Sequence, residues 1–405
     1  MIQASNPKAR GDLELVPMEH EGQQLILIRD PLGLVAEGTA ILPPMLQFMA
    51  LLDGSRGLAK LAEELGQAMG GGPAPVAQLQ GLVDELSQTG LLEDERYLAA
   101  AGAMRAEFAA APTRTAANAG QSYPEDAEEL AEFLQGILDA AEAPEPGPGP
   151  IRALVSPHID PPVGREVYGA AYRALAESKQ RPKRVVVLGI GHSMDEGLFC
   201  PCQKDFTTPL GVAANDAATS AALAKAAGDA LSLDDFVHRD EHSIEFQLIF
   251  LQRILGAESF SLVPVLCGNL MHGLPEYTRA AYQEAAGGFL AGLRELAADP
   301  QTLLVAGVDL CHVGPKFGHQ AQASELLHEA GAHDRALLAA VAKGDADALW
   351  AESARVRDRY HVCGFSALAA LLEVLGPGQN QILSYQMMQE EPTQSAVGFG
   401  AGVLY

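Results

Sequence analysis

Four histidines and one cysteine in this sequence are placed where they could bind a metal ion: His158, His192, His242, His312 and Cys363. Imidazole nitrogen and thiolate sulfur are common protein ligands for borderline and soft metals. Cys363 precedes a predicted helix, whose N-terminus would lower the thiol pKa toward the thiolate that a metal requires. No compact CxxC or HExxH signature is present, so spacing alone leaves open both a metal site and a purely structural role.

These residues stand at the ends of predicted strands and helices. The candidate strands are 152–156, 184–189, 261–266, 302–307, 382–387 and 397–404. Amphipathic or apolar helices are predicted between them, for example at 168–179, 217–226, 243–255 and 365–375. The alternation favours one α/β domain with a largely buried central sheet flanked by helices. Because ligands bind at the carboxyl ends of strands in such folds, His158, His192 and His312 are predicted to meet there.

A series of sequence blocks resembles the Memo family, in particular the proteins called AmmeMemoRadiSam system protein B. The blocks occur in the family's order, and the resemblance covers about residues 117–405. They are AGQSYP (119–124), SPH (156–158), LGIGH (188–192), TPLG (208–211), DEHSIEFQLIFLQ (240–252), LVPVLCG (262–268), DLCHVG (309–314), CGFSALAALL (363–372) and AVGFGAGVLY (396–405). Memo proteins are similar in fold to the class III extradiol dioxygenases, which use non-haem iron.

The resemblance implies a metal site. Carried over by motif, His158 and His192 are the imidazole ligands, and Cys363 stands where a dioxygenase has a carboxylate. Iron or copper is therefore the expected cofactor, with zinc as a further option, because sulfur softens the usual two-His, one-carboxylate iron site. Ring-cleaving activity is not carried over.

The resemblance also implies supporting residues. His312 matches the acid/base histidine of the dioxygenases, and Asp309 is expected to orient it. His242 and Glu245, from the EHSIE block, are candidate pocket or catalytic residues. The chain departs from the family after His158, where Asp160 precedes two prolines. Asp160 could be a hydrogen-bond partner of the site, an extra ligand or a turn residue, and we favour the turn.

Other cysteines and histidines have weaker signals. Cys200-Pro201-Cys202 is interpreted as a loop, Cys311 as a residue buried beside the site, and His361 as a minor site candidate. The remaining histidines considered are in polar or helical contexts and are predicted to lie at the surface: His238, His272, His319, His328 and His333.

The N-terminal residues have a different pattern. Residues 25–29 read as a strand, and helices are predicted at 43–52, at 57–69 and, after a break at 70–75, around 76–86. This outline resembles the PqqD-like winged-helix domains, which hold leader peptides for modifying enzymes. We expect a PqqD-like domain at 1–98, a linker at 99–116 and the Memo-like domain at 117–405.

Composition excludes several classes of partner. The 405 residues have a formal net charge of -25, which disfavours binding to nucleic acid or anionic membranes. The sequence shows neither a signal peptide nor a membrane span, so a cytoplasmic protein is expected. Five cysteines in so large a chain are expected to be free thiols or metal ligands rather than a disulfide framework.

Two functions remain open. One is a metal-dependent oxidoreductase in which His312 moves protons. The other is a non-catalytic protein that binds a peptide or stores a metal in the same pocket; a zinc hydrolase with Glu245 or Asp160 as base ranks last. The family resemblance implies radical-SAM and AMMECR-type proteins as partners, and the N-terminal domain implies a peptide partner.

Overall fold

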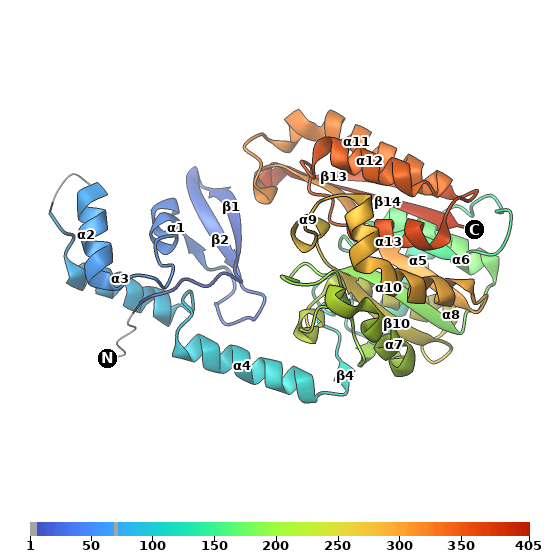
Figure 1. The fold of residues 1–405 in the computed structure, drawn as a ribbon, viewed down its shortest axis with the longest axis horizontal. Helices are drawn as coiled ribbons and strands as arrows, with labels where there is room; N and C mark the ends of the chain where they lie inside the picture. Colours follow the sequence, from blue (N-terminus) through green and yellow to red (C-terminus); the bar gives the residue numbers. More distant parts are fainter. Residues whose placement is uncertain (1–5, 69–71) are drawn as a thin grey trace. The chain divides into compact units, whose positions relative to one another are not determined.

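The computed structural model describes residues 6–68 and 72–405, and the chain separates into the units Met1–Ala110 and Ala111–Tyr405 (Figure 1). Each unit has its own hydrophobic core, and the larger one has a core on each face of its main sheet.

The N-terminal unit begins with a β-hairpin. Strand β1 (Glu14–His20) pairs antiparallel with β2 (Gln23–Arg29), which also pairs with the short β3 (Ala40–Ile41). Glu21 and Gly22 join β1 to β2 with φ of 52° and 77°, as a two-residue type I′ turn requires.

Four helices follow: α1 (Pro43–Met49), α2 (Leu58–Ala68), α3 (Val76–Gln88) and α4 (Glu95–Ala110). The first three correspond to the predicted helices, although Met69, Gly70 and Gly71 lie outside the described residues. Helix α4 and strand β4 (Thr113–Arg114) occupy most of the range predicted as a linker. The winged-helix and PqqD-like assignments stay predictions.

The main sheet of the C-terminal unit has eight strands. They are β5 (Ala153–Ser156), β6 (Arg184–Ile190), β7 (Phe199–Pro201), β10 (Ser261–Cys267), β11 (Thr302–Gly307), β12 (Asp309–Val313), β13 (Gln381–Glu390) and β14 (Ser395–Leu404). The order is β12-β14-β5-β11-β6-β10-β7, and β13 pairs with β14. Strands β5, β11, β6 and β10 are parallel, whereas β7, β12, β13 and β14 make antiparallel pairs.

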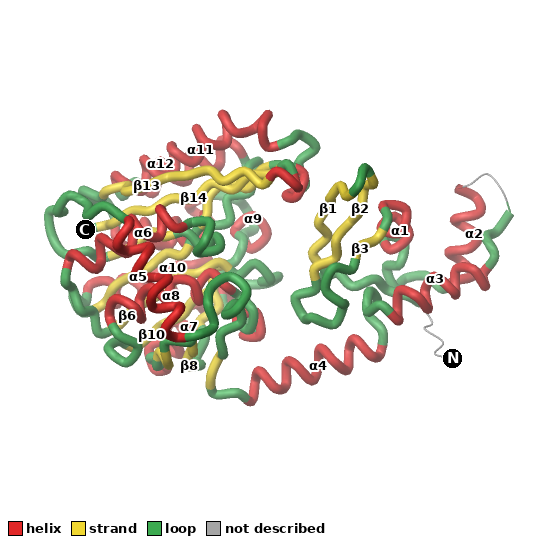
Figure 2. The backbone as a smooth tube through the Cα atoms, turned by 180° about the vertical axis from the view of Figure 1, so that it is seen from behind, coloured by secondary structure: helices red, strands yellow, loops and turns green. Residues whose placement is uncertain are grey.

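Helices cover both faces of this sheet, so the strands are apolar on both sides. One core contains residues of α5 (Ala127–Ala140), α6 (Arg165–Ser178) and α8 (His242–Leu255), which Figure 2 shows in front of the strands. The other contains residues of α7 (Ala217–Ala227), α10 (Arg279–Ala298), α11 (Ala323–Lys343), α12 (Ala346–Val356) and α13 (Phe365–Leu375). Along β6, Val185 and Val187 face the first core, and Val186 and Leu188 face the second.

The predicted α/β class is confirmed, and each predicted strand of this unit is present. Strand β12 was not predicted, because its polar residues Asp309 and His312 break the apolar pattern. A small sheet of β4, β8 (Asp205–Thr208) and β9 (Gly211–Ala213) was not predicted either.

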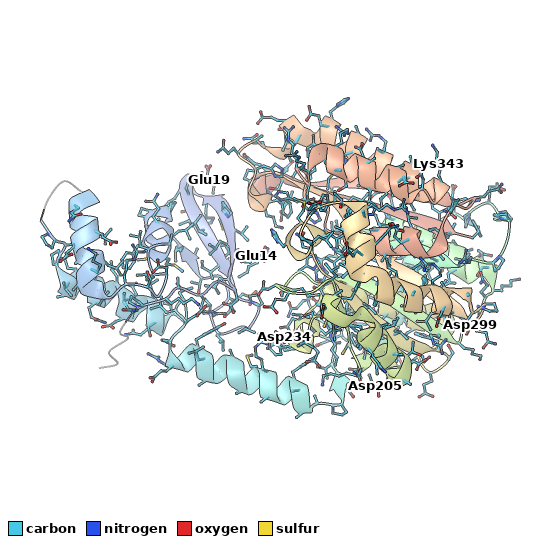
Figure 3. The ribbon with its side chains drawn as sticks, viewed as in Figure 1. Glu14, Glu19, Asp205, Asp234, Asp299 and Lys343 are labelled. Atoms are coloured by element: carbon cyan, nitrogen blue, oxygen red, sulfur yellow. The ribbon has the colours of Figure 1, made fainter. Side chains whose placement is uncertain are left out.

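The exposed side chains reflect the excess of acidic residues in the composition. Acidic side chains such as Glu14, Glu19 and Asp234 are exposed (Figure 3). Within the part of the chain that the structure describes, no helix combines the length and the apolar character needed to cross a bilayer.

Candidate metal centre

Three predicted ligands meet at the carboxyl ends of the parallel strands. His158 lies two residues after β5, His192 two residues after β6, and Cys363 two residues before α13. One potential ligand atom from each lies within 4.8 Å of the other two. The structure therefore brings together the His, His, Cys set that the sequence predicts.

His158 is oriented by the protein backbone. Its Nδ1 is 2.9 Å from the carbonyl oxygen of Gly307, which can only accept, so Nδ1 carries the proton. Its Nε2 is therefore left with a lone pair, 3.4 Å from Cys363 Sγ. The ring is buried, and burial lowers the His158 pKa to about 3. A neutral imidazole with a fixed tautomer is the form that binds a metal.

His192 is oriented by a carboxylate. Glu241 lies with Oε2 3.0 Å and Oε1 3.2 Å from His192 Nδ1, and it accepts the His192 backbone N–H at 3.1 Å. Burial opposes charge on the ring, but the Glu241 carboxylate outweighs it and raises the His192 pKa well above its ordinary value. Glu241 holds the Nδ1 proton and leaves Nε2 for a metal, which must displace any proton there.

Cys363 differs from its prediction in one respect. Burial raises the pKa of its thiol, and the hydrogen bond and charge of His192 only partly oppose this. The prediction that the helix N-terminus would lower this pKa is wrong for the protein without an ion, because α13 starts in a desolvated environment. The charge of a bound cation would favour the thiolate.

His242 joins the cluster as predicted. Its ring stacks on His192 with centroids 5.0 Å apart and meets His158 edge-on at 5.3 Å. Its Nδ1 is 3.3 Å from Glu241 Oε1, and burial lowers its pKa to about 4. His192, Glu241 and His242 also have ligand atoms within 4.8 Å of one another. We interpret Glu241 as an outer partner of the histidines because it already accepts from His192.

His312 and Asp309 both lie beside the cluster, but they are not paired as predicted. His312 Nδ1 donates to the carbonyl oxygen of Leu310 at 2.9 Å, so this backbone group orients its ring. Asp309 instead accepts the backbone N–H of His158 at 2.9 Å. Burial lowers the His312 pKa to about 4 and raises the Asp309 pKa. A neutral His312 could accept a proton from a bound molecule.

Glu245 is not brought to the cluster. Its carboxylate forms a buried ion pair with Arg114 and accepts from Tyr123 Oη and from the backbone N–H groups of Ala117 and Asn118, both at 2.9 Å. These partners occupy the carboxylate, so the structure gives Glu245 a structural environment rather than a place in the pocket. Arg114 also donates to the carbonyl oxygen of Glu241 at 2.8 Å.

Glu241 was the site residue that the sequence reasoning passed over. It lies directly before His242, in the block that supplied Glu245. The feature that could have identified Glu241 is its position as the N-cap of α8, where its carboxylate accepts the N–H of Ser243 at 2.9 Å.

The structure also places the three candidates with weaker signals, Asp160, Cys311 and His361. Asp160 is exposed, and its carbonyl accepts from Val163 and Gly164 at 2.9 and 3.0 Å, as in a turn. Cys311 is buried, with Sγ 3.6 Å from the carbonyl oxygen of Ala330. His361 is exposed and lies at the cavity described below.

Three further predictions need correction. Cys200 lies in strand β7 rather than in a loop, whereas Cys202 follows the strand in a loop as predicted; both are buried free thiols, and burial raises their pKa to about 12 and about 11. His238 and His333, predicted at the surface, are buried. Partners compensate their burial: His238 Nε2 donates to a carbonyl oxygen at 2.8 Å, and His333 Nδ1 lies 2.7 Å from Glu352.

A cavity of about 640 Å³ adjoins the cluster. His192 and Cys363 line it, so a molecule bound there would contact the candidate metal ligands. Its other lining residues include the apolar side chains Met271, Tyr277 and Phe365.

Comparisons with known proteins give long matches. A family model described as "Memo-like protein" matches residues 114–403. A "MEMO1 family protein" of Aquifex aeolicus is 28% identical over 384 residues, which cover 94% of this chain and 96% of the relative. A MEMO1 family protein of Thermus thermophilus is 32% identical over 332 residues, covering 82% of this chain and 94% of the relative. A MEMO1 family protein of Methanopyrus kandleri is 30% identical over 284 residues, covering 67% and 91%.

Proposed function

The chain belongs to the Memo family, and from that premise we propose that it binds a redox-active metal, iron or copper, through His158, His192 and Cys363. The observation that supports this most is the meeting of three ligand atoms within 4.8 Å of one another. Each histidine uses its other ring nitrogen for a hydrogen bond, as metal-binding histidines almost always do. The donor set therefore fits a metal ion.

The thiolate decides which metals are proposed. Two imidazoles and one sulfur favour iron, copper or zinc over magnesium or calcium. Iron or copper, when bound, would supply one-electron or oxygen chemistry. The chain's own contribution is to hold the ligands, to keep His158 neutral, and to place His312 and His242 where they can accept or hold a proton.

We further propose that the protein acts in a radical-SAM-associated modification system, with AMMECR-type partners and a peptide partner for the N-terminal unit. The support is the family membership and the N-terminal hairpin-and-helix unit. The 96% coverage of the Aquifex relative indicates that this chain's two-unit length is shared with another family member.

The metal proposal is tested by elemental analysis of protein purified without added metal. We expect near-stoichiometric iron or copper in the wild type, and loss of most of it in His192→Ala, because one of three ligands is removed. His328→Ala is the matched control, since His328 is an exposed histidine on α11. A metal-free wild type that also fails to take up Fe(II), Cu(I) or Zn(II) would overturn the proposal.

An alternative function is non-catalytic binding of a peptide or a metal in the same pocket. The variant His312→Ala separates the two functions, because His312 lies beside the cluster without belonging to the ligand set. Metal content is expected to stay at the wild-type level. Loss of substrate-dependent oxygen consumption in this variant would support the enzyme, whereas unchanged turnover would remove His312 from the reaction.

A further inference from the structure

The segment before Cys363 has an unusual backbone. Arg357, Asp358 and His361 have φ of 51°, 54° and 49°, in the left-handed region that residues other than glycine rarely adopt. Such residues cost conformational free energy and cluster at ligand sites, where the surrounding structure holds them. Arg357 is the C-cap of α12, a position where the left-handed conformation is common, so the two further residues, Asp358 and His361, are the ones that indicate a function for this segment.

All three of these residues line the cavity that adjoins the metal cluster. A molecule in this cavity can therefore contact Arg357 as well as the candidate ligands His192 and Cys363. The volume of about 640 Å³ suits a small organic molecule.

Arg357 is the one arginine or lysine among the residues that line this cavity, and it is separate from the candidate metal ligands. Its side chain is exposed, and among residues 6–68 and 72–405 it has no hydrogen-bond or ion-pair partner. The neighbouring Asp358 accepts the N–H of Val362 at 3.0 Å with one of its carboxylate oxygens. A guanidinium binds a carboxylate with two parallel hydrogen bonds.

The acidic residues that line the cavity favour a monoanion over a dianion as the bound molecule. Asp195 and Asp358 also face the cavity. A phosphate dianion would be repelled by both carboxylates, whereas a monoanion would meet less repulsion for the same contact with one guanidinium. The apolar side chains Met271, Tyr277 and Phe365 can cover the rest of the molecule.

We propose that this cavity binds a small organic carboxylate, held by Arg357, with its apolar body against Tyr277 and Phe365. The inference deepens the proposed function, on which it rests for the statement that the ligand lies beside a metal. Binding to Arg357 itself can be measured without metal, so the two proposals can fail separately.

The test uses Arg357→Gly, which removes the guanidinium and suits the left-handed backbone. Lys179→Gly is the matched control, because Lys179 is also a basic residue at a helix C-terminus with φ of 55° and does not line the cavity. Arg357→Lys keeps the charge but loses the two-pronged contact. The probes are benzoate, its neutral analogue benzamide, and phenylphosphonate as the phosphate-like dianion.

Calorimetric titration of metal-free and metal-loaded protein gives the answer, with metal content measured on the same samples. We expect benzoate to bind wild type and Lys179→Gly equally, and Arg357→Gly about tenfold more weakly, as for loss of a charged hydrogen bond. Arg357→Lys should be intermediate, and benzamide should bind weakly to every variant.

Equal benzoate binding by wild type and Arg357→Gly would overturn the proposal, as would absence of benzoate binding at its solubility limit. Tighter binding of phenylphosphonate than of benzoate would overturn the carboxylate class. Benzoate binding through Arg357 in a wild type that fails to take up Fe(II), Cu(I) or Zn(II) would support the carboxylate site while contradicting the metal proposal.

Discussion

Two regions at the start of α8 use the same type of side chain for opposite purposes. Glu241 and Glu245 are one helical turn apart. Glu241 contacts the rings of His192 and His242, whose side chains are 37% and 35% exposed. Glu245 contacts Arg114, and both of those side chains are 1% exposed.

The two carboxylates differ in whether the groups around them are left free to bind a ligand. Around Glu245, the guanidinium, a tyrosine hydroxyl and two backbone N–H groups occupy the carboxylate, so the region is closed to solvent and to ligands. Glu241 contacts the Nδ1 atoms of His192 and His242. The Nε2 atoms on the other side of the two rings have no bond to Glu241, and they reach the cluster. A hydrogen-bond network in which every polar group has a partner stabilises the fold, whereas a network that leaves ring nitrogens without a partner can bind a ligand.

The largest expected effect is on stability, from Arg114→Ala. Removing one partner of a buried ion pair leaves Glu245 charged and without its counter-ion, which costs roughly 3–5 kcal/mol of unfolding free energy. Urea denaturation followed by circular dichroism measures this loss.

The control is the double variant Arg114→Met/Glu245→Gln, which removes both charges but keeps an acceptor for Tyr123. It is expected to recover part of the stability lost by the single variant. A single variant within about 1 kcal/mol of wild type would contradict the contrast between the two regions.

The next effect is on metal affinity, from Glu241→Gln. Loss of the carboxylate that orients a metal-binding histidine typically weakens binding about 10- to 100-fold. Stability should fall by only about 1 kcal/mol, because the amide oxygen can still cap α8. Competition with a chelator measures the affinity, and an unchanged affinity would show that Glu241 does not serve the metal site.

The smallest effect is the pH dependence of the metal-free protein. The His192 pKa is raised, so its pairing with Glu241 stabilises the fold below the ordinary value of 6.5 and is lost as pH rises through the folded pKa. The Glu241 pKa is lowered, so the contribution is present above 4.5 and is lost as pH falls through the folded pKa.

The stability difference between wild type and Glu241→Gln should therefore be greatest between pH 4.5 and 6.5. It should stay below about 1 kcal/mol, because His192 is 37% exposed and water screens the pair. Urea titrations across this range measure it, and a difference that grows steadily above pH 8 would have the wrong sign.

The sequence blocks that resemble the Memo family predicted the ligands better than their surroundings. His158 and His192 could be placed because they follow apolar strands, and strand ends converge in this fold. The role of Glu241 could not be read, because Glu241 and Glu245 are both polar residues at a helix start, and only tertiary packing distinguishes them. The Leu310 carbonyl that orients His312 leaves no mark on residue type, since every residue has one.

Strand β14 has a consequence for the order of folding. It follows every other strand in sequence, yet it lies between β5 and β12 in the sheet. During synthesis, β5 therefore has an open edge until the chain through Leu404 has left the ribosome. The strand that carries His158 to its position thus gains this neighbour only after the strands that precede β14 have been made, and a nascent chain stalled before β14 would present an unpaired edge to chaperones or to other chains.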